Sequence, residues 1–592
     1  MKTMNEYRTH TCGELRKQDI GKTVKLAGWI QRKRNLGNLC FVDMRDHYGI
    51  TQCVFDKSSP LFEKVENTRP ESVIGIEGEV VLRESINPNM PTGDIEIKVA
   101  KMEIYSTAEV LPFQIAVEDD APEDIRLKYR FLDLRKERIH HNMMIRSQVI
   151  KRMRELMCEQ GFTEYQTPIL TASSPEGARD FLVPSRLNPG KFYALPQAPQ
   201  QFKQLLMVSG FDKYFQIAPC FRDEDPRADR SPGEFYQLDM EMSFATQEDV
   251  FKVIEHTMGS IFNEFAFGKT VTQAPFVRIP FREAMAKYGS DKPDLRNPLI
   301  LEAATDFFSD SGFGIYDGLV KEGKTVKALV LKGNGEKPRS FFDKLDAYAK
   351  GEGMGGIAYV ALSAGGAKGI AKLLSEAKLN ELQSKFGLSQ GDAIIFMVGS
   401  GMKFDKFSGR LRNKIGEELD LVDKNSFKLC WIVDFPFFEE NEETGKIEFS
   451  HNPFSMPQGG MDALLNKNPL DILAYQYDLV CNGYELASGA VRNHEPEIMY
   501  KAFELAGYDH SVVDNKFGGM INAFKYGAPP HAGCAPGVDR TVMLILDEPI
   551  IRDVIIFPLN GKAQDLMMQA PNYPFDEQQL KDLHIKVDLK DE

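Results

Sequence analysis

Three arginines stand among acidic residues at 221–230, and a strand-like alternating segment follows at 234–241. An arginine presented from a strand binds two oxygens of an anion at once, because its donors form a planar fork. A second candidate, Arg540, ends the short motif 537–540. Two arginines on separate segments suit a polyphosphate bound at both ends. A charge run can equally be a cluster of surface salt bridges, so the rest of the chain must decide.

The composition is that of a soluble, multidomain protein. The chain has 592 residues, with 42% hydrophobic and 27% charged residues, and this length is typical of about three to five domains. It contains no apolar run of the roughly 20 residues that a membrane span needs, and its N-terminus lacks an apolar signal core. We therefore expect a cytoplasmic protein without a membrane partner.

The cysteines and the net charge narrow the classes of partner. The 8 cysteines are scattered without metal-ligand spacing, which indicates reduced thiols and predicts no structural zinc. The net charge of −14 argues against indiscriminate nucleic-acid binding, and we expect no DNA partner. It leaves room for a local basic surface.

The N-terminal residues 1–112 resemble a small β domain. Short strands separated by turns, with one helix at 61–67, suggest a five-stranded oligonucleotide-binding (OB) barrel. The strands are expected at 24–30, 40–45, 50–55, 73–82 and 94–99. The basic loop 31–38 lies near Phe41, and basic groups beside a stacking ring can bind single-stranded bases. A solvated loop beside a core phenylalanine is the alternative.

The remaining chain is expected to hold an antiparallel sheet interrupted by an insertion. A charged linker at 113–140 precedes a helix at 141–160, and the proline-bearing segment 162–170 suits an edge strand or one at a subunit interface. Residues 291–428 change to a glycine-rich α+β pattern, whose glycines match no phosphate-binding fingerprint.

From residue 429 the first pattern returns. Long strands are expected at 471–481 and 484–492, and a helix at 538–546. Both βαβ alternation and a glycine fingerprint are missing from this pattern, which argues against a dinucleotide-binding fold. We therefore expect a multidomain α+β protein.

Several ordered motifs resemble those of class II aminoacyl-tRNA synthetases. The segment 221–227 resembles motif 2, 537–540 resembles motif 3, and 161–168 resembles motif 1. The more specific segments 175–184 and 194–203 are similar to bacterial-type aspartyl-tRNA synthetases, and the resemblance covers essentially the whole chain. It implies the following parts: an OB-fold anticodon-binding domain (1–112), a hinge (113–140), a split class II catalytic domain (141–290 and 429–560), an inserted α+β domain of the GAD-like kind (291–428) and a C-terminal extension (561–592).

The resemblance implies an aspartate–tRNA ligase that is a homodimer and works with Mg²⁺ bound to ATP. In such an enzyme, the α-carboxylate of L-aspartate attacks the α-phosphorus of ATP, and the aspartyl group then passes to the 3′ end of tRNA-Asp. This chemistry depends on positioning and on charge neutralisation. Arg222, Glu485 and Arg540 would be the catalytic residues, and Asp478 and Glu485 would hold the metal.

Further roles carry over from the same motifs. The residues expected to bind ATP are Arg222, Asp223, Glu224, Ser231, Glu485, Gly537, Val538, Asp539 and Arg540. Those expected to bind aspartate are Glu176, Gln200, Lys203, Arg222, Asp239, His451 and Arg492. Lys203 and Arg492 would bind its β-carboxylate, which can be buried only beside cations. The chain departs from the family at Ser231, where glutamine is frequent, and at Gly233, which looks like an extra residue.

The barrel would bind the anticodon through residues Arg32, Arg34, Leu36, Phe41 and Gln52. Phe41 would stack on a base, and Gln52 would read a base edge. Non-discriminating relatives, which charge both tRNA-Asp and tRNA-Asn, often carry histidine where Leu36 stands. We therefore expect a discriminating enzyme, with the non-discriminating one as the alternative.

Three neighbouring classes of protein fit the sequence less well. A synthetase for asparagine or lysine is disfavoured by the paired cations Lys203 and Arg492. An asparagine synthetase of the same catalytic fold would lack the barrel. A non-catalytic RNA-binding paralogue is disfavoured because Arg222, Glu485 and Arg540 are all present.

Overall fold

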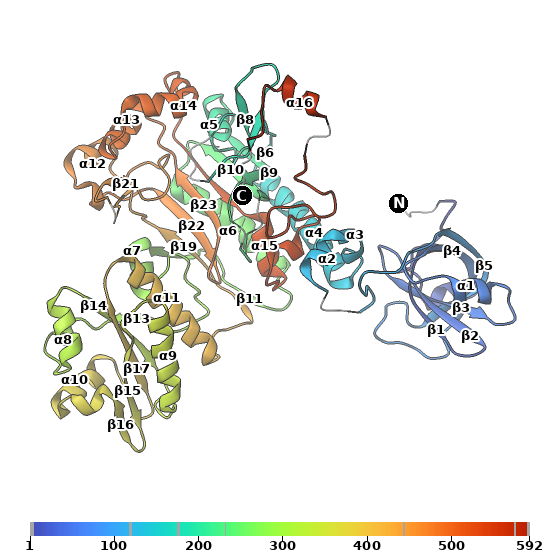
Figure 1. Ribbon diagram of the computed structural model, residues 1–592, viewed down its shortest axis with the longest axis horizontal. Helices are drawn as coiled ribbons and strands as arrows, with labels where there is room; N and C mark the ends of the chain where they lie inside the picture. Colours follow the sequence, from blue (N-terminus) through green and yellow to red (C-terminus); the bar gives the residue numbers. More distant parts are fainter. Residues whose placement is uncertain are drawn as a thin grey trace. The chain divides into compact units, whose positions relative to one another are not determined.

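The computed structural model describes residues 5–117, 121–173, 178–225, 227–230, 233–441, 444–573 and 576–588. These residues form two compact units (Figure 1). The first comprises the described residues up to 143, with 556–560 and 564–572; the second comprises 144–555, 561–563 and the residues from 573 onward.

The first unit contains a closed five-stranded barrel, as the strand pattern predicted. Its strands are β1 (Thr23–Asn35), β2 (Leu39–Arg45), β3 (Ile50–Asp56), β4 (Val73–Leu82) and β5 (Ile95–Ser106), in the order β1-β2-β3-β5-β4, with α1 (Leu61–Asn67) between β3 and β4. Alternate residues of β2 are buried, which is the period of a strand with one face in a core. β5 continues seven residues beyond its predicted end at 99.

The turn between β2 and β3 forms at the predicted place. The Asp46 amide donates to the Gly49 carbonyl at 3.0 Å, and the Asp46 carboxylate accepts from the Tyr48 amide at 2.8 Å. A Cβ at Gly49 would lie 2.7 Å from the Gly13 Cα, so the close approach of two backbones requires glycine there.

The segment expected as a linker is largely helical. It forms α2 (Glu123–Lys128), α3 (Arg130–Asp133) and the start of α4 (Glu137–Glu159). Arg130 is buried and donates to the Asp133 carboxylate at 2.6 Å. The charges of this segment had suggested a linker. In the structure, they pair with one another inside the unit.

The second unit is built on an eight-stranded sheet. The strand order is β12-β19-β22-β23-β24-β10-β9-β6, antiparallel except for the two edge pairs, β12 with β19 and β6 with β9. Its strands are β6 (Thr163–Glu164), β9 (Lys213–Arg222), β10 (Gly233–Ser243), β12 (Val277–Pro280), β19 (Leu429–Val433), β22 (Gln476–Cys481), β23 (Tyr484–Val491) and β24 (His531–Pro536). The proline-bearing segment 162–170 contributes only the short edge strand β6, and β22 begins five residues later than predicted.

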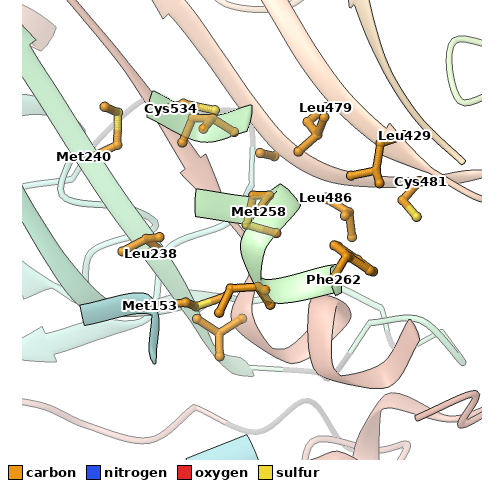
Figure 2. Close-up of a cluster of buried hydrophobic side chains, with 14 of the residues drawn as sticks. Met153, Leu238, Met240, Met258, Phe262, Leu429, Leu479, Cys481, Leu486 and Cys534 are labelled. Carbon is orange, nitrogen blue, oxygen red and sulfur yellow. The ribbon is translucent and has the colours of Figure 1, made fainter. Parts of the chain in front are cut away.

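Helices α4 and α6 (Gln247–Glu264) cover one face of this sheet. Figure 2 shows Met153 of α4 and Met258 and Phe262 of α6 packed with side chains such as Leu238, Leu479 and Leu486, which come from β10, β22 and β23. Trp431 is completely buried in the same core, and its ring stacks on Phe251 at 4.2 Å between centroids. With that face closed, the functional groups of the strands gather on the other face.

The insertion forms a separate five-stranded sheet with helices on both faces (Figure 1). The strand order is β13-β14-β17-β15-β16, for β13 (Leu301–Ala303), β14 (Thr325–Leu331), β15 (Ala358–Ser363), β16 (Gly366–Gly369) and β17 (Ala393–Gly399). One face packs on α9 (Arg339–Gly351) and α11 (Gly401–Glu418), and the other packs on α8 (Gly314–Lys321) and α10 (Glu376–Lys385).

Smaller elements complete the second unit: β7 (Leu182–Pro184), β8 (Phe192–Ala194), α5 (Gln200–Val208), β11 (Thr270–Val271), α7 (Phe281–Tyr288), β18 (Ser426–Phe427), β20 (Phe438–Glu440), β21 (Ile447–Phe449), α12 (Gly460–Asn466), α13 (Pro496–Leu505), α14 (His510–Phe524), α15 (Val538–Ile545) and α16 (Glu577–Asp582). Among the described residues, every helix is too short or too polar to span a bilayer.

Candidate active site

A cavity of about 570 Å³ opens on the face of the large sheet opposite α4 and α6. Its walls come from β9, β10 and β23, from α5, and from the start of α15. The predicted site residues that line it are Gln200, Lys203, Arg222, Glu224, Asp239, His451, Glu485, Arg492, Gly537, Asp539 and Arg540. The fold therefore brings together residues that are more than 300 positions apart in the sequence.

Arg222 and Arg540 enter the cavity from different elements. Arg222 ends β9, where its Nε donates to the Gln197 carbonyl at 3.4 Å and its guanidinium lies 4.9 Å from the centroid of the Phe235 ring. Arg540 lies in the first turn of α15 and donates to the Glu485 carbonyl at 2.6 Å. Main-chain oxygens hold and orient both guanidinium groups, and Arg540 also lies 3.6 Å from the Asp229 carboxylate.

Two carboxylates on neighbouring strands were expected to hold the metal: Glu485 of β23 lines the cavity near both arginines, and Asp478 of β22 lies close to Glu485 but does not line the cavity. Asp478 of β22 is buried, and its Oδ1 has no hydrogen-bond partner. Burial and the nearby Glu485 carboxylate raise the pKa of Asp478 well above its usual value. Burial alone would raise the pKa of Glu485, but Lys292, with Arg540 and Arg222, lowers it. A buried acid with a free oxygen next to an ionised acid fits a divalent cation that also binds phosphate oxygens.

At the other end of the cavity, two cations and two acids are packed together. The Lys203 ammonium lies 2.7 Å from Asp239 and 3.4 Å from Glu241. Arg492 binds Glu241 at two points, 2.8 and 3.0 Å. The side chains of all four residues are at most 2% exposed. Burial alone would raise the pKa of Glu241, but Arg492 and Lys203 outweigh it and lower that pKa.

Gln200 belongs to this end of the cavity, whereas His451 lies near Asp291, Lys292 and Glu485. Gln200 is buried, and its amide nitrogen has no hydrogen-bond partner, so a donor faces the site. His451 lies beside the rings of Phe281 and Phe435, and its Nδ1 is 2.8 Å from the Ser450 hydroxyl. Glu176, expected to hold the substrate ammonium group, lies outside the described residues, as does Ser231.

Of the residues expected to contact ATP, Asp223 and Val538 do not line the cavity, and Asp539 lines it with its carboxylate bound to other protein groups. Asp223 does not line the cavity; it is half exposed and lies 3.5 Å from Arg179. Val538 is completely buried in the core, because the helix turns its side chain towards the sheet. Asp539 is 2% exposed, accepts from the Tyr236 amide at 2.7 Å and pairs with Arg146, so its carboxylate joins three elements.

Glu224, expected on the adenine side, lines the cavity but pairs with Arg230. Phe235 and Lys292 also line the cavity and were not predicted, and neither was Glu241, which pairs with Lys203 and Arg492 beside it. Phe235 and Glu241 could have been found, because they lie at alternate positions of the strand that follows Arg222. Lys292 comes from the segment after α7 and carries no sequence signal that places it beside Glu485.

In the barrel, the predicted anticodon residues fall into two groups. Leu36 is 70% exposed, and Phe41 is half-buried on the outer face of β2, where its register partner on β1 is Arg34. Gln52, by contrast, is buried. Its carbonyl accepts from Arg34 at 2.8 Å and Arg83 at 2.7 Å, and its amide donates to Glu96 at 2.6 Å. Gln52 therefore orients Arg34, and its carbonyl oxygen and one amide N–H are already in hydrogen bonds within the barrel. Arg32 donates to the Ala116 carbonyl.

Comparison with known proteins places both units in one family. Residues 122–561 match the model described as tRNA synthetases class II (D, K and N), and residues 24–105 match the OB-fold nucleic acid binding domain. A protein of Gluconobacter oxydans is 58% identical over 99% of this chain and 98% of its own length. One of Paramagnetospirillum magneticum is 61% identical over 99% of this chain and 67% of its own. Both are called aspartate–tRNA(Asp/Asn) ligases.

Solved structures agree at the level of the fold. The asparaginyl-tRNA synthetase of Pyrococcus horikoshii, complexed with asparaginyl-adenylate, covers 93% of this chain with a TM-score of 0.57 at 19% identity, and the match spans 97% of that chain. The predicted combination of an OB-fold barrel with a class II antiparallel-sheet domain is thereby confirmed.

Proposed function

This chain belongs to the bacterial-type aspartyl-tRNA synthetases, within the class II tRNA synthetases of the D, K and N group, and we propose that it charges both tRNA-Asp and tRNA-Asn with L-aspartate. ATP activates the amino acid, giving aspartyl-adenylate and pyrophosphate, and the aspartyl group passes to the 3′ end of the tRNA. The enzyme is thus a ligase that forms aminoacyl-tRNA.

This proposal rests on the different arrangement of charges at the two ends of the cavity. Arg222 and Arg540 supply positive charge at one end, which suits the triphosphate. Lys203 and Arg492 lie at the other end, held apart by Asp239 and Glu241. An acidic side chain is buried favourably only where cations await it, so this end favours aspartate over asparagine or lysine.

Residues of both ends would bring the reactants together. Arg222 would bind the α-phosphate and the attacking carboxylate at once, reducing the repulsion between two anions. Arg540 would bind the far phosphates, and the main-chain N–H groups at the start of α15 would favour the same charge. The ring of Phe235, beside Arg222, offers a stacking surface for adenine. Gln200 faces the aspartate end with a free donor.

Mg²⁺ would be held by Asp478 and Glu485. The free oxygen of Asp478 and the ionised state of Glu485 are the features of this chain that fit it. A bound Mg²⁺ neutralises phosphate charge. The described residues contain no group of three or more histidine, cysteine, aspartate or glutamate side chains that could hold a metal ion. Oxygens of the nucleotide would therefore be needed as further ligands.

The choice between one tRNA and two rests on the barrel. Leu36 led us to expect a discriminating enzyme, but the relatives that are about 60% identical over the whole chain carry names that include both tRNAs. Those names favour the non-discriminating alternative. Leu36 itself is 70% exposed on the barrel.

The position of one strand bears on how subunits would associate. Strand β6 is the edge of the large sheet, and an edge strand of this kind suits pairing across a two-fold axis. We propose a homodimer in the cytoplasm.

Two assays on the purified protein test the proposal. Pyrophosphate exchange is measured with aspartate, asparagine or lysine, and exchange driven by aspartate alone is expected. Transcripts of tRNA-Asp and tRNA-Asn are then aminoacylated with labelled aspartate, and comparable kcat/KM values are expected. Exchange with asparagine only would refute aspartate activation, whereas charging of tRNA-Asp alone would restore the discriminating alternative.

A further inference from the structure

Lys292 is a cation of the active-site cavity that no motif identifies. It lies in the segment between α7 and the inserted sheet, and it lines the cavity with Arg222 and Arg540. Its ammonium is 3.0 Å from Glu485 Oε2 and 3.5 Å from Asp291 Oδ2. The side chain is 39% exposed, so the charge faces the open cavity and is not enclosed by protein.

The position of Lys292 relative to the two arginines suggests what it binds. Glu485 is the shared neighbour: its main-chain carbonyl accepts from Arg540, and its carboxylate pairs with Lys292. Lys292 and Arg540 are therefore on the same side of the cavity, at the end away from Lys203 and Arg492. A lysine is a mobile point charge with three donors on a four-carbon arm, well suited to phosphate oxygens whose positions shift during a reaction.

The inserted domain fixes the segment that carries Lys292. Gly289 ends α7 with φ of 65°, and a Cβ there would lie 2.4 Å from the Gly409 nitrogen of α11. Such a contact lets the two backbones touch without side chains between them.

Arg412, also on α11, holds the other side of this segment. It is completely buried and donates to the main-chain carbonyls of Asp294 at 3.0 Å, Asn297 at 2.7 Å and Leu299 at 2.6 Å. Lys292 thus lies between two points, Gly289 and Asp294, at which the segment contacts α11. A buried guanidinium that donates to three main-chain carbonyls holds the backbone of the segment in one conformation.

We propose that Lys292 is a phosphate-binding residue for the terminal phosphates of ATP, presented to the cavity by the inserted domain. The assignment rests on the proposed function, because it requires that the cavity bind a nucleoside triphosphate. It gives the inserted domain a role in the first step, the release of pyrophosphate, in addition to any contact with tRNA. Glu485 keeps the Lys292 ammonium turned into the cavity, at 3.0 Å.

Calorimetric titration of ATP and of AMP into full-length protein tests the assignment. Lys292→Met keeps the length of the side chain and removes its charge. One charge-assisted contact to phosphate predicts ATP binding weaker by about 10- to 100-fold, with AMP binding changed less than about twofold, because AMP lacks the terminal phosphates. Lys332→Met is the matched control: Lys332 lies in the inserted domain and pairs with Asp392 at the same distance, 3.0 Å.

Two results would overturn the assignment. Unchanged ATP affinity in Lys292→Met would mean that the ammonium does not reach the phosphates. An equal loss of ATP and AMP affinity would mean that Lys292 only maintains the shape of the site. Aspartate-driven pyrophosphate exchange by the wild type separates these results from failure of the proposed function, since that exchange would persist when the assignment alone is wrong.

Discussion

Arg492 and Glu241 are joined by two parallel hydrogen bonds on the large sheet, from Nε to Oε1 at 2.8 Å and from Nη2 to Oε2 at 3.0 Å. The arginine leaves its strand at the end of β23, and the glutamate comes from β10, two strands away. Glu241 also lies 3.4 Å from Lys203. The acid therefore sets the separation of the two cations that are proposed to receive the aspartate side chain.

Substitution of Arg492 tests this arrangement. Arg492→Leu leaves Glu241 buried with only Lys203, and breaking such a pair typically costs about 3–5 kcal/mol. Arg492→Lys keeps the charge but loses the two-point geometry, so we expect a fold close to wild type in stability and a KM for aspartate raised by about 10-fold or more. Urea unfolding and exchange kinetics measure the two effects. A Lys variant with wild-type KM would show that the fork geometry does not matter for aspartate.

His531 should make the stability of the second unit depend on pH. It is completely buried; its Nδ1 is 2.8 Å from the Pro529 carbonyl, and its Nε2 is 3.1 Å from Gln204 Oε1. Burial lowers its pKa below the usual value of 6.5. The unfolded chain therefore binds a proton at a higher pH than the folded chain does. The free energy of unfolding should fall as pH drops below about 6.5, by up to about 1.4 kcal/mol per pH unit, and be level above it.

Thermal unfolding between pH 5 and 8 measures this slope. The neutral variant His531→Gln should unfold with a shallower pH dependence, whatever its overall stability, because it removes one group that binds its proton at a higher pH in the unfolded chain than in the folded chain. Parallel profiles for the two proteins would mean that His531 is not the source of the pH dependence.

Changes in the barrel should affect tRNA and leave the first chemical step intact. Phe41→Ala removes a half-buried ring on the outer face of β2, and loss of one base stack is worth about 1–3 kcal/mol. We expect the KM for tRNA to rise by about 5- to 150-fold, with aspartate-dependent pyrophosphate exchange unchanged. The matched control is Tyr48→Ala, which removes an exposed ring at the turn between β2 and β3. Equal effects of the two substitutions would argue against a specific stacking role for Phe41.

Features that depend on a short stretch of sequence could be predicted before the fold was known. The ends of β9 and α15 are short motifs, so Arg222 and Arg540 could be placed before the fold was known. Orientation within a motif was harder: Val538 and Asp539 belong to the same motif as Arg540, but helical geometry turns Val538 into the core. The period of that helix, with Val542 and Ile545 also buried, would have indicated this.

Residues whose role depends on tertiary contacts could not be placed. The Gln52 side chain has the right chemistry to read a base, and only the hydrogen bonds from Arg34, from Arg83 and to Glu96 show that its carbonyl oxygen and one amide N–H are already bound. Lys292 meets Glu485 because an insertion of well over a hundred residues folds apart from the main sheet and returns the chain to it. Neither contact leaves a periodic or spacing signal in the sequence.

The placement of Asp539 leads to the last prediction, in which a motif residue acts on stability and not on ATP. Asp539→Asn keeps the size of the side chain but removes its negative charge. That charge pairs with Arg146, and it also strengthens the hydrogen bond that Asp539 accepts from the Tyr236 amide. Charged, buried hydrogen bonds are worth about 1.5–3 kcal/mol each. We expect a loss of about 2–3 kcal/mol in the free energy of unfolding, with a KM for ATP within about threefold of wild type.

Asp223→Asn is the comparison for this variant, because Asp223 belongs to the other motif and makes an exposed 3.5 Å pair with Arg179. Such a pair is worth less than about 1 kcal/mol, so the comparison variant should unfold like the wild type. Urea unfolding followed by pyrophosphate exchange on the same preparations gives both quantities. If Asp539→Asn kept its stability and lost more than about tenfold in ATP affinity, the carboxylate would be a nucleotide contact, as its position beside Arg540 first suggested. The observed hydrogen bond to β10 and the ion pair with α4 argue for the opposite result, since both depend on the charge and neither involves the cavity's arginines.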